Sequence, residues 1–352
     1  EEKLRSEFPN WLYRASAKGD LVLILDGLNQ LDNRGNAQEL DWLPPELPEN
    51  VKVILSTLPS RALDVINERD WPRLEIKPLT IAEREKLVND FLALYSKKLS
   101  DERVARIIRD HQSENPLGLR LLLDELRQFG VYGKKLDLVI DRYLGADSIP
   151  EMIQLILARC ESDYEGERPR LVRDALSYLW AARRGLSEAE LLDLLGKEGL
   201  PLPHRIWSPL SLALENSLVD RDGLLGFSHD YIRQAVEGRY LKGDQAKKKT
   251  HIKLADYFGS LEGTPNRKVD ELPWQLAEAQ AWERLYNVLA NFDFFQGLHE
   301  HSRNDLLTYW AAVEENSAFN RVEAYQAVVN NPEEVELHVL NWLSTMYIES
   351  GY

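Results

Sequence analysis

The stretch LVLILDGLNQLD at residues 21–32 decides the fold of the N-terminal part of the chain. Five apolar residues run without a break up to Asp26, and such runs are typical of strands buried in a parallel sheet. A strand of this kind places the residue after it at the carboxyl edge of the sheet, where open α/β folds bind ligands. A second run, VKVILST at residues 51–57, ends on Ser56 and Thr57. We therefore predict a parallel sheet with a polar edge.

Helical and strand signals alternate around these two runs. We expect a helix over 3–17, a short strand over 74–76 and, between the two main strands, a proline-containing loop or short helix over 33–50. From Thr80 onward the chain reads as helical. Thr80 with Glu83 forms a capping box for a helix to about Tyr95, and further helices start at Ser100-Asp101 and Pro116.

The region after residue 147 has a different pattern. Several helices lead into two short apolar runs joined by Asp222-Gly223, a strong hairpin signal. Helices followed by a small hairpin predict a winged-helix domain, and the segment after Leu241 is helical and rich in aromatic residues. Its end, LSTMYIESG at residues 343–351, is a single partial match to the first helix of a tetratricopeptide repeat, with Ser344 where the pattern prefers glycine.

The predicted fold class is α/β followed by mainly α. The motifs given below imply, by resemblance, the rear part of a P-loop NTPase parallel sheet at residues 1–78, a helical lid at 79–146, a winged helix at 147–240 and a helical repeat-like region at 241–352.

Composition limits the classes of partner. Forty-three basic and fifty-eight acidic residues give a net charge of −15, which weighs against binding to nucleic acid or anionic lipid. The single cysteine, Cys160, cannot form an intrachain disulfide, and its apolar-periodic surroundings predict a buried, inert thiol. No apolar run approaches the roughly 18–20 residues that span a bilayer. We expect a cytoplasmic protein with no membrane segment.

Four motifs occur in the order used by NACHT-type STAND NTPases. They are DGLNQL at 26–31, STLP at 56–59, NPLGL at 115–119 and FSHD at 227–230. The chain resembles this family over about residues 20–240, in particular the nephrocystin and telomerase-associated branch, which often carries tetratricopeptide or WD repeats behind the NTPase.

The resemblance implies a role for individual residues. Asp26 matches the Walker B aspartate, which holds Mg²⁺ through water. Ser56 and Thr57 lie at the sensor strand, where a hydroxyl can reach the γ-phosphate. Pro116 matches the lid proline that packs on adenine, and His229 matches the winged-helix histidine that reaches the β-phosphate of ADP. The cofactors implied are ATP or ADP with Mg²⁺.

The chain departs from the family pattern in three places. We find no phosphate loop of the form G-x-x-x-x-G-K-[ST], so we expect the chain alone to bind nucleotide poorly or not at all. Asn29 and Gln30 stand where many relatives carry acidic residues that position the attacking water, and a neutral amide is a poor general base. Leu58 replaces a frequent arginine, which leaves Arg61 as a substitute for stabilising phosphate charge. We expect at most a slow ATPase, with Asp26 and Gln30 at the catalytic positions.

Considered without the resemblance, the same residues have simpler interpretations. Asp26 can start an Asp-Gly turn, Ser56 or Thr57 can cap a strand, and His229 can be a core or helix-start residue. His299-Glu300-His301 lacks the i, i+4 spacing of a zinc site and predicts a solvated loop.

Basic residues in the second half of the chain favour neither DNA nor membrane. The basic patch of Lys242, Lys247–Lys249 and Lys253 predicts a solvated helix face or an intramolecular contact. The segment 205–216 carries one basic residue, Arg205, which is too few for a DNA-recognition helix.

Two functions follow from the sequence. The first is a STAND signalling switch: ADP between the NTPase core and His229 holds an inactive state, and exchange for ATP permits homo-oligomerisation. The second is a non-catalytic helical scaffold for protein–protein interaction with a decayed NTPase domain. In both, other proteins bind through C-terminal repeats.

Overall fold

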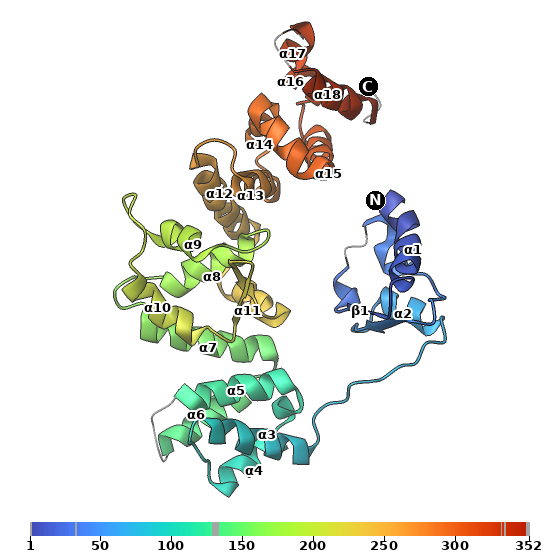
Figure 1. Cartoon of the computed structure of the whole chain (residues 1–352). Coiled ribbons are helices and arrows are strands. Elements are labelled where there is room, and N and C mark those ends of the chain that lie inside the picture. Colours follow the sequence, from blue (N-terminus) through green and yellow to red (C-terminus); the bar gives the residue numbers. More distant parts are fainter. Residues whose placement is uncertain (1, 32–33, 129–133, 332, 334–335, 350–352) are drawn as a thin grey trace. The chain divides into compact units, whose positions relative to one another are not determined.

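The computed structural model describes residues 2–31, 34–128, 134–331, 333 and 336–349 (Figure 1). Asp32 of the deciding stretch and Ser350-Gly351 of the repeat-like segment lie outside these residues. The chain divides into two compact units, unit 1 at residues 1–77 and unit 2 at residues 78–352, which we describe separately. It is mainly helical, with a few short strands.

Unit 1 contains the predicted pair of parallel strands. Strands β1 and β2 pair in register, with Leu21 opposite Val51 and Leu25 opposite Leu55. The predicted strand over 74–76 is wrong, because residues 71–80 form no regular structure and no strand pairs with them in the described part of the chain. The elements are α1 (Glu2–Ser16), β1 (Leu21–Leu25), η1 (Leu28–Gln30), η2 (Arg34–Glu39), β2 (Val51–Leu55) and α2 (Arg61–Asn67).

Only one face of this two-stranded sheet is covered within unit 1. Leu25 and Leu55 pack on a small core of Leu28, Leu40, Ala62 and Val65. On the other face the side chains of Val22, Ile24 and Ile54 are more than half exposed. Among the described residues of unit 1, the two strands are therefore covered on one face.

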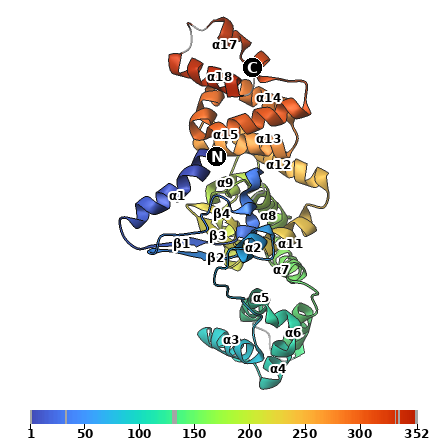
Figure 2. The ribbon, with the colours of Figure 1, turned by 90° about the vertical axis from the view of Figure 1, so that its right-hand side faces the viewer.

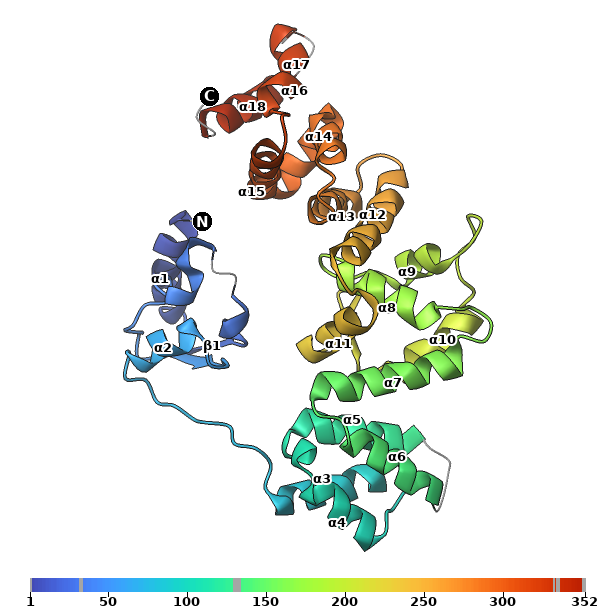
Figure 3. The ribbon, with the colours of Figure 1, turned by 180° about the vertical axis from the view of Figure 1, so that it is seen from behind.

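Unit 2 begins with a group of helices whose starts follow the sequence signals (Figure 3). The capping box of Thr80 and Glu83 is present, Ser100 is the N-cap of the next helix, and Pro116 is the first residue of another. The elements are α3 (Ile81–Leu94), α4 (Asp101–Arg109), η3 (His111–Glu114), α5 (Pro116–Gln128) and α6 (Lys134–Leu144).

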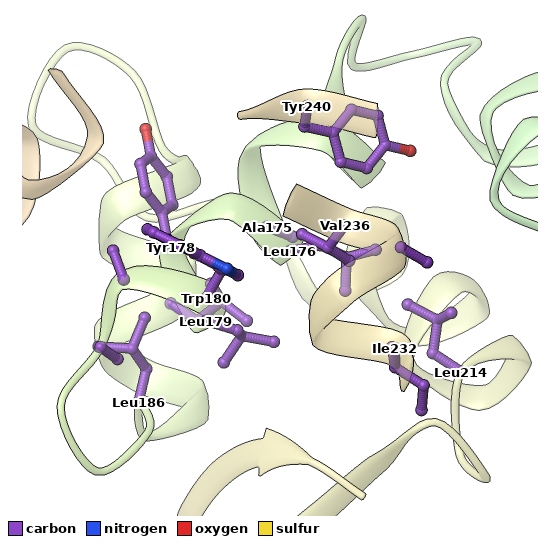
Figure 4. Packing of buried hydrophobic residues seen from close by; sticks show 14 of the residues in the cluster. Ala175, Leu176, Tyr178, Leu179, Trp180, Leu186, Leu214, Ile232, Val236 and Tyr240 are labelled. Atoms are coloured by element: carbon purple, nitrogen blue, oxygen red, sulfur yellow. The ribbon is translucent and has the colours of Figure 1, made fainter. Parts of the chain in front are cut away.

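The next part of unit 2 is built around α8, whose residues are almost all buried. Figure 4 shows α8 packed against α11, with Leu176 and Val236 between them. The predicted hairpin is confirmed, and both turn residues have positive φ, 55° at Asp222 and 83° at Gly223. The elements are α7 (Ile149–Tyr164), α8 (Leu171–Ala181), α9 (Glu188–Leu195), α10 (His204–Ala213), β3 (Leu218–Arg221), β4 (Leu224–Phe227) and α11 (Asp230–Tyr240).

The last part of unit 2 is a series of helices in which α12 packs on α13, α14 on α15, and α15 on α18 (Figure 2). His299-Glu300-His301 lies inside α15, so the predicted loop there is wrong, although the helix is kinked at Ser302. The elements are α12 (Asp244–Ser260), α13 (Asn266–Glu278), α14 (Trp282–Ala290), α15 (Phe292–Asn316), α16 (Arg321–Ala324), α17 (Gln326–Asn330) and α18 (Leu337–Glu349).

One continuous apolar core runs through unit 2, from Val88 in α3 to Met346 in α18. Cys160 is fully buried in it, and burial raises the pKa of its thiol to about 12, as expected for an unreactive cysteine. None of the described helices is both long enough and apolar enough to traverse a membrane.

Candidate functional site

The carboxyl ends of β1 and β2 bring Asp26 and Ser56 together. The Ser56 hydroxyl donates to Oδ1 of Asp26 and accepts from the backbone N–H of Gly27 at 2.9 Å. The N–H of Leu28 donates to the carbonyl of Ser56 at 3.0 Å. Gly27 has φ 71°, a left-handed conformation that favours glycine, which lets the chain turn directly after the carboxylate. The edge therefore presents an exposed carboxylate whose orientation is set by its neighbours.

The other two site residues of unit 1 lie beside this pair. Thr57 is half-buried, and its hydroxyl donates to the carbonyl of Leu58 at 2.9 Å and hydrogen-bonds Ser60 Oγ at 3.1 Å. Gln30 is exposed at the end of η1. Chemically, the edge offers one carboxylate able to bind a metal-bound water, with hydroxyl and amide groups nearby.

Asn29 has a structural role that the sequence did not reveal. Its side-chain oxygen accepts a hydrogen bond from the N–H of Leu58 at 3.1 Å, so it ties the turn after β1 to the segment after β2. The only sequence signal for this was an amide in the turn that follows a strand. This hydrogen bond gives Asn29 a structural role that does not depend on catalysis.

Arg61 is not a free cation. It donates two hydrogen bonds to the carboxylate of Glu39, at 2.8 and 2.7 Å, and this pairing lowers the pKa of Glu39. Arg61 would have to give up this partner to stabilise phosphate charge.

Pro116 and His229 belong to unit 2. Pro116 is exposed at the start of α5, where the Asn115 side chain accepts from the N–H of Leu117 at 2.9 Å and caps the helix. His229 is the exposed N-cap of α11, and its ring stacks on Tyr231 with 5.0 Å between ring centres. Among the described residues, no hydrogen bond, ion pair or ring contact joins Pro116 to His229.

The six predicted residues therefore divide between the units, with Asp26, Gln30, Ser56 and Thr57 in unit 1 and Pro116 and His229 in unit 2. The structure assembles the first group at one sheet edge. No group of three or more histidine, cysteine or acidic side chains within the described residues has the arrangement of a metal site.

The chain is similar to three longer proteins. A TPR repeat-containing protein of Dictyostelium discoideum is 37% identical over 323 residues, which cover 90% of this chain and 19% of that protein. Nephrocystin-3 of Homo sapiens is 25% identical over 341 residues, covering 93% of this chain and 25% of that protein. The NACHT domain- and WD repeat-containing protein 1 of Homo sapiens is 30% identical over 284 residues, which cover 72% of this chain and 17% of that protein.

One of these relatives is named for TPR repeats, and another for a NACHT domain and WD repeats. The chain spans a quarter or less of the length of each of these relatives. No protein-family model matches the sequence.

Proposed function

We propose that the chain is a helical scaffold for protein–protein interaction. The observation that carries this proposal is the series of packed helices from α12 to α18, which continues the core of unit 2, together with the similarity to a TPR repeat-containing protein. Stacked helix pairs expose extended surfaces that bind other proteins.

Internal contacts hold the last helices in fixed positions, which is what a docking surface requires. The Tyr325 hydroxyl donates to the carbonyl of Leu289 at 2.6 Å and accepts from the Trp310 indole N–H at 3.3 Å. Arg321 donates two hydrogen bonds to Glu314, at 2.8 and 2.6 Å. A preorganised surface loses little conformational entropy when a partner binds.

Helix α18 carries the apolar residues expected of a contact surface. Leu337 is 75% exposed and Ile348 is 70% exposed, while Val339, Leu343 and Met346 face the core. A partner that covers these two side chains would remove apolar surface from water.

The test compares partner binding by variants of the full-length protein. Leu337→Glu with Ile348→Glu should remove partners identified by crosslinking and mass spectrometry, whereas Asn341→Glu, at an exposed polar position of the same helix, should keep them. Asp26→Asn should also keep them. Unchanged partners in the double variant, or a requirement for nucleotide, would contradict the scaffold proposal.

A second proposal, the nucleotide-dependent switch, is favoured by the contact between Asp26 and Ser56 and by the similarity to a protein named for a NACHT domain. In this proposal Asp26 holds Mg²⁺ through water, Gln30 stands near the attacking water, and Ser56 and Thr57 sense the γ-phosphate. Pro116 packs on adenine and His229 contacts the β-phosphate of ADP. Hydrolysis of ATP is slow, and exchange permits oligomerisation.

Nucleotide retention tests this second proposal. Full-length protein is purified and denatured, and released nucleotide is identified by chromatography. The switch requires stoichiometric ADP that falls in His229→Ala and stays in His204→Ala, an exposed histidine at the start of α10. Protein purified without nucleotide would leave the scaffold as the function.

A further inference from the structure

Two adjoining cavities, each of about 370 Å³, lie where the start of α8 meets the end of α11 and the start of α12. Both are lined by Arg170, Arg173, Tyr240 and Lys242. Lys249 and Lys253 of α12 line the second cavity. Helices that are distant in sequence thus bring a cluster of cations to one place.

Most of these cations lack an acidic partner. In the part of the chain that the structure describes, Arg170, Arg173, Lys242 and Lys249 form no ion pair with a carboxylate. Lys253 donates to the hydroxyl of Tyr178 at 3.3 Å. Five positive side chains are therefore available to an anion.

The carboxylates that line the cavities are already engaged. Glu161 accepts two hydrogen bonds from Arg239, at 2.8 and 2.6 Å, and one from Tyr240 at 2.5 Å. Asp174 pairs with Arg168 at 2.9 Å, and Glu165 accepts from the N–H of Val172 at 3.1 Å. They offset part of the positive charge but do not pair with the five cations, so the site is positive in a chain of net charge −15.

Ser177 on α8 lies beside these cations. It lines the second cavity and is 5% exposed, and its Oγ has no hydrogen-bond partner among the described residues. The Oγ itself is closed to solvent in this rotamer, so a ligand oxygen in the cavity could reach it only after the side chain rotates.

We propose that these cavities bind a compact anion that carries two or more phosphate groups. Guanidinium groups match phosphate oxygens two at a time, and ammonium groups add point charge. The cavities are open to solvent and all five cations are exposed, so a bound anion would stay partly hydrated. A long polyanion would be repelled by the acidic remainder of the chain, which favours a small molecule or a single lipid headgroup.

The site divides the basic patch that the sequence singled out. Lys247 pairs with Glu237, and Lys248 donates to Gln280, so these two are the expected intramolecular contacts. Lys242, Lys249 and Lys253 instead line the cavities. The inference is independent of the scaffold and of the switch, because it uses neither α18 nor the edge of β1 and β2.

Isothermal titration calorimetry of the complete chain tests the proposal, with inorganic phosphate, tripolyphosphate and inositol hexakisphosphate as probes. We expect one saturable site for at least one of the two polyphosphates, weak binding of inorganic phosphate, and affinity that falls as salt rises. Arg173→Gln with Lys249→Gln should weaken binding at least about tenfold. The matched control, Lys197→Gln with Arg221→Gln, removes the same charge from exposed positions outside the cavities and should stay within about twofold.

Vesicles of phosphatidylcholine with and without 5% phosphatidylinositol bisphosphate distinguish the source of the phosphates. A lipid headgroup is identified if the chain floats with the vesicles that contain phosphatidylinositol bisphosphate, the double variant Arg173→Gln with Lys249→Gln does not, and the soluble polyphosphates bind weakly. A free metabolite is identified if a soluble polyphosphate binds tightly and the chain does not float with the vesicles. The proposal is overturned if no probe binds, if the control loses as much affinity as the cavity variant, or if RNA binds more tightly than every compact probe.

If circular dichroism shows that the double variant does not fold, Lys249→Gln alone replaces it. This variant changes an exposed helix position, and its affinity should fall about threefold. Partner binding through α18 should be unchanged in all these variants, so failure here and failure of the scaffold are distinguishable.

Discussion

Unit 1 and unit 2 differ in how much apolar surface each buries by itself. In unit 1 the sheet packs on a cluster of four buried residues and leaves Val22, Ile24 and Ile54 more than half exposed. In unit 2 one apolar core extends through all the helices from α3 to α18. A small core supports little stability, because burial must offset the entropy of ordering the chain. We therefore expect unit 1, which holds most of the residues that resemble a nucleotide site, to be less stable by itself than unit 2, which holds the proposed binding surfaces.

The largest effect is expected when the two units are separated. A fragment of residues 78–352 should keep its helical circular dichroism and unfold cooperatively on heating. A fragment of residues 1–77 should show no cooperative transition, since a two-stranded sheet with one bare face is not stable alone. If the short fragment melts as sharply as the long one, unit 1 is stable by itself and the proposed difference between the units is wrong.

The next effect concerns the core of unit 2. Trp207 in α10 is fully buried, so Trp207→Ala should lower the free energy of unfolding by about 3–5 kcal/mol. Trp11→Ala, at an exposed position of unit 1, should change it by less than about 0.5 kcal/mol. Urea denaturation followed by circular dichroism measures both. Equal losses of unfolding free energy in the two variants would show that burial does not determine the contribution of these tryptophans to stability.

A smaller effect should come from a buried charge at the junction of α13 with the segment after α8. Glu271 is fully buried, and burial raises its pKa, while the hydrogen bond from Gln275 and the charge of Arg267, 3.3 Å away, oppose this shift. Arg267→Met removes this cation and also its hydrogen bonds to Glu190 and the Gly185 carbonyl, while Glu271 keeps its hydrogen bonds from Gln275 and from the N–H groups of Arg183 and Arg184. The variant should cost about 2–4 kcal/mol, less than a fully buried pair because Arg267 is partly exposed.

The double variant Arg267→Met with Glu271→Gln is the control for this explanation. It should be more stable than Arg267→Met alone, because the buried carboxylate that lost its cation is replaced by a neutral amide. Urea denaturation of both variants at pH 7 gives the comparison. An equally unstable double variant would assign the loss to packing and not to charge.

The smallest effect is a pH dependence at the contact between α7 and α11. Hydrogen bonds from Arg239 lower the pKa of Glu161 below its ordinary value of 4.5, burial opposes this, and Tyr240 adds to it. Because the pKa of Glu161 is lower in the folded chain than in the unfolded chain, its contribution to the free energy of unfolding is complete above pH 4.5. The contribution is lost as the pH falls through the pKa of the folded state.

Glu161→Gln should therefore lose about 1 kcal/mol of stability at pH 7, and the difference from the unmodified chain should shrink as pH falls below 4.5. Glu262→Gln, at an exposed position, should differ little at either pH. Denaturation by urea at pH 7, 5 and 3.5 measures this, and a difference that grows on acidification would have the wrong sign.

Local signals in the sequence predicted local structure well. The apolar runs gave β1 and β2, the Thr80–Glu83 pair gave the start of α3, and Asp222-Gly223 gave the hairpin, because each depends on neighbouring residues. The strand expected at 74–76 failed because strand formation needs a partner elsewhere in the chain, which the sequence pattern does not supply.

The candidate site was predictable in part for the same reason. Parallel strands place their ends at one edge, so the proximity of Asp26 and Ser56 follows from the pattern. The sequence did not show which of Ser56 and Thr57 contacts Asp26, because this depends on the acceptor that each hydroxyl reaches in the folded chain. Nor could it predict the basic cavities, because Arg170, Arg173 and Lys249 come together only through the packing of α8 with α11 and α12.

Hydrogen exchange of the full-length protein, with and without Mg²⁺ and ADP or ATP, tests the scaffold account most directly. We predict that amides of β1 and β2 exchange faster than those of α8, and that nucleotide changes the protection of neither. Nucleotide-dependent protection at residues 21–30, at residues 51–60 and around His229 would contradict the account and establish the switch.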